Sequence, residues 1–269
     1  MYRRTLLLSL VCLCLAAPAV GGERLKLATT TSTENSGLLA DLLPAFEATC
    51  DCTVDVIAVG TGQALALGRK GDVDAVLVHA PALEQTFVAH GYGVDRRTFM
   101  QNDFVVVGPR SDPAKIRGSK DGPAALVAIQ EAGAAFVSRG DESGTHHREK
   151  SLWKASGKEP EWTGYLAAGQ GMGAVLLMAH EKQGYTLTDR GTWLARKANL
   201  DLEVLVEGDP QLLNPYSVMA VNQESFDWVK RGLAGKLSDW LCSADGQRRI
   251  GAFRIGGEPL FTPLLLPED

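Results

Sequence analysis

The sequence predicts an α/β fold in two lobes, each built on a mostly parallel sheet flanked by helices. Three observations support this prediction. Short apolar strands alternate with helical segments along the chain. Polar loops follow several of these strands, and α/β sheets hold ligands beyond the carboxyl ends of their strands. Finally, the apolar stretches VVVGP and NPYSVMAV stand on either side of a self-contained block of strands and helices.

The first predicted elements follow the order strand, helix, strand, helix, strand. Residues 24–30 form a short apolar strand, and residues 53–59 alternate apolar and polar side chains as a strand does. Between them, residues 36–49 have the periodicity of an amphipathic helix. A short helix at 62–71 then leads to a strand at 73–80. Because helices join these strands, we expect the sheet to be largely parallel.

The later elements are predicted by the same patterns. Further strands are expected at 103–110, 133–140, 202–209 and 215–222, and helices at 145–156, 171–184 and about 224–241. Residues 184–198 hold a short strand, a helix cap at Thr188 and a helix. The chain would therefore cross twice between the lobes. Lobe 1 would take residues 23–107 and 214–269, and lobe 2 would take residues 108–213.

The N-terminus has the layout of a secretory signal peptide over residues 1–22. Arg3 and Arg4 precede an apolar run from Leu6 to about Ala17, and small residues follow. The run is short for a bilayer-spanning helix, so we expect a cleaved signal and a periplasmic protein. Lipid anchoring stays open, although no cysteine follows a small residue there.

The net charge and the cysteine content restrict the possible functions and the expected disulfide bonds. The formal charge of −5 becomes −7 when Arg3 and Arg4 are removed with the signal, which argues against a nucleic-acid partner. Three cysteines remain, Cys50, Cys52 and Cys242. Export favours a bridge from Cys242 to one of the other two, and no bridge at all is the alternative.

Three polar loops lie at the carboxyl ends of predicted strands. They span residues 29–37, 59–64 and 138–145, and each runs straight into a predicted helix. The free N–H groups and the dipole at a helix start favour an anion. The candidate side chains and amides in these loops are Thr30, Thr31, Ser32, Thr61, Gly62, Arg139, Ser143, Gly144 and Thr145. The alternative for each loop is simple helix capping or an ordinary turn.

These loops carry a resemblance that covers nearly all of the mature chain. The motifs ATTTSTENSGLL, AVGTGQALALGRKGDVDAVLVHAPALE, SRGDESGTHHRE, GQGMGAVLLMA and YTLTDRGTWLA resemble those of the tungstate-binding proteins of bacterial tungstate ABC transporters. The resemblance implies a two-lobe, type II-like periplasmic binding protein with the oxyanion in the cleft between its lobes. It also implies delivery of tungstate, and possible delivery of molybdate, to a membrane permease, with no enzymatic activity.

The resemblance assigns the ligand to the nine loop residues given above. Tungsten would be bound as the tungstate oxyanion and not as a metal cation, with no other cofactor, and we expect a monomer. Which threonines of the first loop touch the ion is left open, and residue types do not separate tungstate from molybdate.

His79 is a candidate near-site residue. The third loop is also similar to that of the phosphate-binding periplasmic proteins, which place an aspartate where this chain has His79. That carboxylate accepts the proton of hydrogen phosphate, whereas tungstate has no proton to offer and a carboxylate would repel it. We therefore hypothesise that His79 favours an unprotonated oxyanion. The alternative is that His79 only packs or hydrogen-bonds nearby.

Other classes of function fit the motifs less well. Ser143 lies close to His146 and His147, but the Gly-x-Ser-x-Gly pattern of a hydrolase nucleophile is absent. His146, His147 and Glu149 could bind a cation, yet no second ligand cluster accompanies them. A binder of another oxyanion, such as molybdate or phosphate, and an extracytoplasmic oxyanion sensor remain the alternatives.

Overall fold

The structure is a computed structural model, and it describes residues 22–266. The predicted signal peptide, apart from Gly22, lies outside the described residues. Within residues 22–266, no helix is both long and apolar enough to cross a membrane.

The central sheet is mixed, with strand order β12-β4-β9-β3-β1-β2. Its parallel part consists of β1 (Glu23–Thr30), β2 (Cys52–Val59) and β3 (Ala75–Val78). The antiparallel part adds β9 (Leu213–Val221), β4 (Gly93–Gly108) and β12 (Thr262–Pro263). The α/β class is as predicted, but the sheet is less parallel than the sequence suggested, because β9 runs antiparallel to both of its neighbours, β3 and β4.

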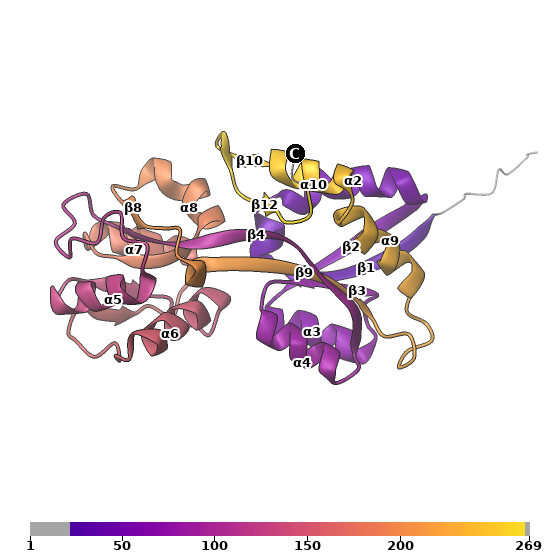
Figure 1. Cartoon of the computed structure of the whole chain (residues 1–269), viewed down its shortest axis with the longest axis horizontal. Coiled ribbons are helices and arrows are strands. Elements are labelled where there is room, and N and C mark those ends of the chain that lie inside the picture. Colours follow the sequence, from indigo (N-terminus) through magenta and orange to yellow (C-terminus); the bar gives the residue numbers. More distant parts are fainter. Residues whose placement is uncertain (1–21, 267–269) are drawn as a thin grey trace, which may run out of the picture.

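Helices cover both faces of this sheet (Figure 1). They are α1 (Thr31–Asn35), α2 (Leu38–Cys50), α3 (Thr61–Lys70), α4 (Pro81–Ala89), α9 (Arg231–Leu241) and α10 (Ala244–Ala252). Leu25, Leu27 and Leu77 pack into the cluster that holds α2 and α9, whereas Ala28 and Val76 pack into the cluster that holds α3. The strands are therefore buried on both faces, which explains their nearly continuous apolar sequences.

A second group of elements is formed by residues 109–212. It contains α5 (Gly122–Glu131), β5 (Phe136–Ser138), α6 (Gly144–Ser156), β6 (Tyr165–Ala167), α7 (Met172–Glu181), β7 (Thr186–Asp189), α8 (Arg190–Arg196) and β8 (Glu203–Val206), with short 3-10 turns at Lys197–Asn199 and Pro210–Leu212. Strands β7 and β8 pair antiparallel with β4, and β5 pairs parallel with β6. Figure 1 shows this second group at one end, joined to the first group (residues 22–92 and 222–266) by β4 and β9. The predicted lobe boundaries fall at the ends of these two strands and stay a prediction.

Three sequence-based element assignments were wrong. Strand β4 begins at Gly93, ten residues before the predicted start, because charged residues such as Arg96 and Arg97 mask its alternation. The cap of α8 is Asp189, whose Oδ1 accepts from the Thr192 amide at 2.8 Å, whereas Thr188 is buried in β7. The helix predicted from residue 224 begins at Arg231.

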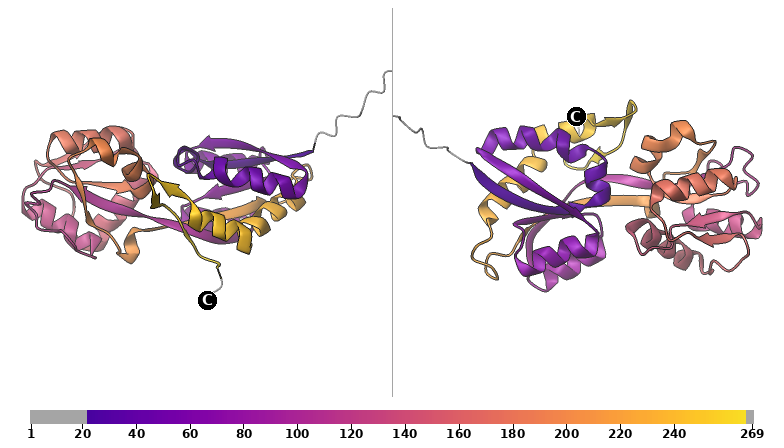
Figure 2. Two further views of the ribbon diagram at one scale, coloured as in Figure 1. Left: turned by 90° about the horizontal axis from the view of Figure 1, so that it is seen from above. Right: turned by 180° about the vertical axis from the view of Figure 1, so that it is seen from behind.

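The chain returns to both groups at its C-terminal end. A hairpin of β10 (Arg254–Ile255) and β11 (Glu258–Pro259) precedes β12, which pairs with β4. Glu258 forms an ion pair with Lys197, just after α8. Figure 2 shows this segment extending from the first group toward the second.

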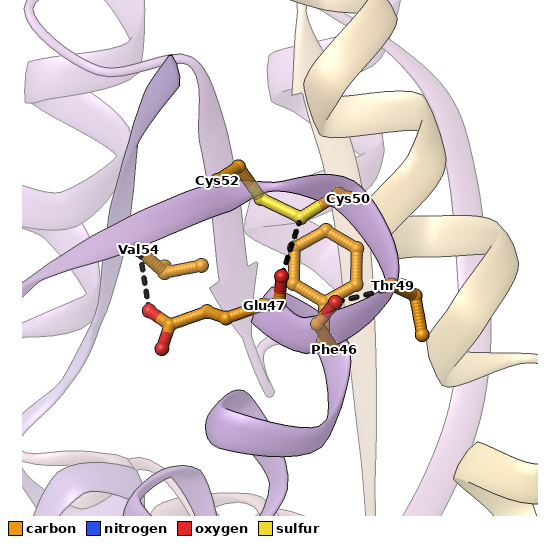
Figure 3. Close-up of a disulfide and its surroundings, with 6 residues drawn as sticks. All are labelled: Phe46, Glu47, Thr49, Cys50, Cys52 and Val54. Atoms are coloured by element: carbon orange, nitrogen blue, oxygen red, sulfur yellow. Dashed lines mark hydrogen bonds between the residues drawn. A yellow bond between two sulfur atoms is a disulfide. The ribbon is translucent and has the colours of Figure 1, made fainter. Parts of the chain in front are cut away.

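The disulfide joins Cys50 to Cys52 (Figure 3). Within residues 22–266, Cys242 has no disulfide partner. The expectation of a bridge to Cys242 was therefore wrong. Cys50 ends α2 and Cys52 begins β2, so the bridge spans the turn between them, with Cα atoms 5.2 Å apart. In the chain-entropy account, so small a loop stabilises by only about 1–2 kcal/mol, less than a bridge to distant Cys242 would.

Candidate functional site

The first two loops and His79 lie at one edge of the parallel sheet. Thr30 is in register with Val59, and Thr29 with Leu77, so β1, β2 and β3 end side by side. The Thr29 hydroxyl donates to the Leu77 carbonyl at 2.8 Å and is fully buried. The Thr29 side chain therefore links β1 to β3 and is not free to bind a ligand. The loop residues that follow it lie beyond the ends of these strands.

Thr30 caps helix α1 and anchors a cluster of hydroxyls. Its Oγ1 accepts from the Thr33 amide at 3.2 Å and lies 3.0 Å from the Ser32 hydroxyl. Thr30 is buried, whereas Thr31 and Ser32 are exposed. The capping alternative is therefore correct for Thr30, while Thr31 and Ser32 present hydroxyls at the surface of the edge.

His79 lies against this cluster and is held from behind by the connecting strands. Its Nε2 is 3.3 Å from the hydroxyls of both Thr30 and Ser32, and its Nδ1 is 2.9 Å from Asn214 Oδ1. The Asn214 amide nitrogen donates to Asn102 at 2.8 Å, which leaves its oxygen to accept from His79 Nδ1–H. The imidazole also stacks on Tyr216, with ring centroids 4.6 Å apart.

Burial and these contacts determine the protonation state of His79. Burial lowers its pKa, and this outweighs the raising effect of the hydrogen bond to Asn214. His79 is therefore neutral near pH 7, with Nδ1 as donor and Nε2 as acceptor. In this state Nε2 accepts the proton of one neighbouring hydroxyl, that of Thr30 or of Ser32, and the ring adds no negative charge to the site.

The third loop is organised around Arg139 and the start of α6. Ser143 caps this helix, with Oγ accepting from the His146 amide at 3.3 Å. Arg139 pairs with Asp141, whose other oxygen accepts from the Ser143 amide at 3.2 Å. Burial raises the pKa of Asp141, but the hydrogen bonds from Ser143 and Arg139 outweigh it and the pKa is lowered. Arg139 Nε is buried and has no hydrogen-bond partner within residues 22–266.

The start of α6, in the second group of elements, approaches His79 of the first group. A Cβ atom at Gly144 would lie 3.7 Å from His79 Cε1, so the backbone of the helix start approaches the imidazole closely. Thr145, the next residue, is buried. The first and third loops, more than 100 residues apart in the sequence, therefore meet around His79.

The second loop lies at the same edge but makes no direct link to this centre. Thr61 and Gly62 begin α3 after Gly60, which has no side chain to cap the helix. A Cβ atom at Gly60 or Gly62 would meet nothing within 4 Å, so the amides here are open to approach. No hydrogen bond between described residues joins Thr61 or Gly62 to His79 or to α6.

Sequence reasoning missed the polar residues that support His79. Asn102 is in β4, and Asn214 and Tyr216 are in β9, the two strands that connect the groups. All three are buried. The available signal was a buried asparagine directly before a proline and an apolar strand, in NPYSVMAV.

The arrangement does not match a hydrolase or a cation site. Ser143 Oγ accepts from the His146 backbone amide, and His146 Nδ1 is engaged by the Glu142 amide at 3.1 Å, so these side chains do not form a nucleophile–base pair. Glu149 instead accepts from Ser138 and Tyr165, and burial raises its pKa. No group of three or more histidine, cysteine, aspartate or glutamate residues able to hold a metal ion occurs in residues 22–266.

Comparison with known proteins agrees with this geometry. The family model described as a PBP superfamily domain matches residues 16–245. The tungstate-binding protein TupA of Peptoclostridium acidaminophilum is 46% identical over 241 residues, which is 88% of this chain and 84% of that protein. TupA of Campylobacter jejuni is 41% identical over 237 residues, covering 86% of this chain and 87% of that protein.

Solved structures give the same result. The tungstate-binding protein TupA from Desulfovibrio alaskensis superposes with a TM-score of 0.86 at 46% identity, covering 91% of this chain and all of that one. A structure titled as the tungstate ABC transporter from Geobacter sulfurreducens has a TM-score of 0.77 at 53% identity, covering 86% and 99% of the two chains. The chain belongs to the PBP superfamily and, within it, to the family of the TupA proteins. The named relatives are binding proteins and not enzymes.

Proposed function

We propose that this protein captures tungstate, or the closely similar molybdate, and delivers it to the permease of an ABC transporter. The observation that carries the proposal is the meeting of the α1 and α6 helix starts around a neutral imidazole. The dipole and free amides at the start of α6 favour an anion there, and Thr31 and Ser32 add exposed hydroxyls. The names of its relatives support tungstate as that anion.

The ligand would lie between the two groups of elements, which act as lobes 23–107 with 214–269 and 108–213. Its oxygens would accept hydrogen bonds from hydroxyls, backbone amides and the Arg139 guanidinium. The proposed contacts are Thr30, Thr31, Ser32, Thr61, Gly62, Arg139, Ser143, Gly144 and Thr145. Closure of the lobes about β4 and β9 would bring the second loop into reach and present one closed shape to the permease.

The proposal also includes where the protein acts and in what oligomeric state. After removal of residues 1–22, the protein would act as a monomer in the periplasm, with tungstate as its ligand and no cofactor or nucleic-acid partner. The ion would be bound whole, as an oxyanion, because the site offers hydrogen-bond donors and no set of metal ligands.

The first test is thermal unfolding with and without tungstate. A ligand at 100 times its dissociation constant stabilises the folded state by about 2.7 kcal/mol. For a chain of this size, this should raise Tm by roughly 5–10 °C. Sodium chloride at equal ionic strength is the control. A Tm that does not respond to tungstate or molybdate would contradict the proposal.

His79 offers a test of anion choice. We expect His79→Asp to weaken tungstate binding by roughly 100-fold, because a carboxylate beside a dianion is repelled. Phosphate, which can donate a proton to the new carboxylate, should gain affinity relative to tungstate. The measurement is calorimetric titration of both anions.

His79→Asn is the matched control, because asparagine has nearly the shape of aspartate without its charge. It should lose much less tungstate affinity than His79→Asp. Equal losses in the two variants, with no gain for phosphate, would mean that His79 acts only through packing and its hydrogen bonds.

A further inference from the structure

Arg148, on helix α6, contacts both chain segments that connect the two groups of elements. Its Nη1 donates to the Gln211 carbonyl at 2.8 Å, and its Nη2 donates to the Leu213 carbonyl at 2.9 Å. Its guanidinium also lies over the ring of Phe104, 5.6 Å from the centroid. Phe104 belongs to β4 and Leu213 begins β9. The guanidinium is thus fixed where the chain passes between the groups.

The charge of Arg148 is not balanced by a direct carboxylate partner. None of the ion pairs within residues 22–266 includes it, and its two acceptors are neutral carbonyls. Burial lowers its pKa, and only the more distant Asp209 acts in the opposite direction. Arg139, another partly buried arginine, is already paired with Asp141. Arg139 therefore has a carboxylate partner within residues 22–266, whereas Arg148 has none.

The position of Arg148 directs this charge toward the candidate site. Residues four apart on a helix share a face, so Arg148 lies on the same face of α6 as Gly144, which approaches His79. Long side chains on a helix lean toward its N-terminus, which here is the anion-binding end. The charges of Asp189 and Arg148 both act on His79: that of Asp189 favours protonation of the ring, and that of Arg148 disfavours it.

We propose that Arg148 is the second positive charge of the oxyanion site, held in place by the carbonyls of Gln211 and Leu213 rather than by an acidic partner. This inference rests on the proposed function. Arg148 acts through its field and not as a direct ligand, so its contribution scales with the charge of the ion. It would favour dianions such as tungstate and molybdate over monoanions of the same shape.

Perrhenate provides the comparison, because it is a tetrahedral monoanion close in size to tungstate. In Arg148→Gln, which keeps an amide donor for the carbonyls but removes the charge, the interaction lost is twice as large for a dianion as for a monoanion. We expect affinity to fall roughly fivefold for perrhenate and therefore about 25-fold for tungstate. Arg148→Lys, which keeps the charge, should retain the wild-type ratio of the two affinities.

Arg69→Gln is the matched control, since Arg69 is an exposed residue in the last turn of α3 and its loss changes the net charge equally. It should leave both affinities unchanged. Arg148→Met repeats the test in case the glutamine variant is too unstable to titrate. Equal losses for tungstate and perrhenate in the neutral variants would overturn the inference and leave Arg148 a structural role. Failure of the wild-type protein to bind tungstate would instead overturn the proposed function.

Discussion

Replacing Arg139 by alanine is expected to weaken tungstate binding about 100-fold, the size of a lost charge-assisted hydrogen bond in a partly buried site. The guanidinium has a buried Nε without a partner within residues 22–266 and stands beside the start of α6. Calorimetric titration of the variant measures the loss directly.

Asp141→Ala is the companion variant. Asp141 orients Arg139 and accepts from the Ser143 amide, but it also places a negative charge near the proposed anion. Removing Asp141 loses the orientation of Arg139 but also relieves the repulsion between its carboxylate and the anion. Because these two effects offset each other, we expect tungstate affinity to change by less than about fivefold. Similar losses in the two variants would contradict the roles given to these residues.

Replacing Arg96 by methionine should destabilise the protein by about 3–4 kcal/mol at neutral pH, because removing one partner strands a buried charge. Its partner Glu84 is fully buried, accepts from Arg96 at 2.9 Å and also accepts from the Ala80 amide at 2.6 Å. Ala80 follows His79, so this carboxylate also supports the segment that carries the imidazole. Chemical denaturation of both proteins measures the difference in unfolding free energy.

The pH dependence of this variant follows from the same burial. Burial raises the pKa of Glu84 even with Arg96 present, and without Arg96 the pKa rises further. A carboxyl group with a raised folded-state pKa costs stability increasingly as pH rises from its unfolded-state pKa to that raised value, and the full cost is present above it. The deficit of Arg96→Met should therefore shrink as pH is lowered below the raised pKa of Glu84 in the variant. A deficit that does not change with pH would contradict this cause.

The neighbouring Arg97 supplies the control. It pairs at 2.6 Å with Asp239, whose side chain is 79% exposed. Water screens such a pair, so Arg97→Met should change stability by less than about 0.5 kcal/mol.

The parts of the fold that the sequence predicted are those set by local pattern. Strands β1 and β2 and helices α2, α3 and α6 lie within one or two residues of their predicted bounds, because alternation, helical periodicity and polar loops are encoded over a few residues. The long strand β4 was found only from residue 103, since its first half faces water in part and carries charges. Its pairing with β9 is a contact between residues far apart in the chain, which local pattern does not report.

The candidate site also has parts that local sequence predicts and parts that depend on long-range contacts. The polar loops around Thr30 and Ser143 were visible because hydroxyls and glycines follow apolar strands directly. The support of His79 by Asn214 and the approach of Gly144 depend on how the two groups of elements meet, so neither could be inferred from spacing. The same limit explains the disulfide, because whether Cys50 pairs with Cys52 or with Cys242 depends on the turn between α2 and β2.

The most direct test of the account is isothermal titration calorimetry of the mature protein with tungstate, molybdate, sulfate and phosphate. The account predicts tight binding of tungstate, measurable binding of molybdate, and none of phosphate, whose proton has no carboxylate to meet at His79. Binding of phosphate at similar strength would contradict the role of His79, and no heat with any of the four anions would contradict the proposed function itself.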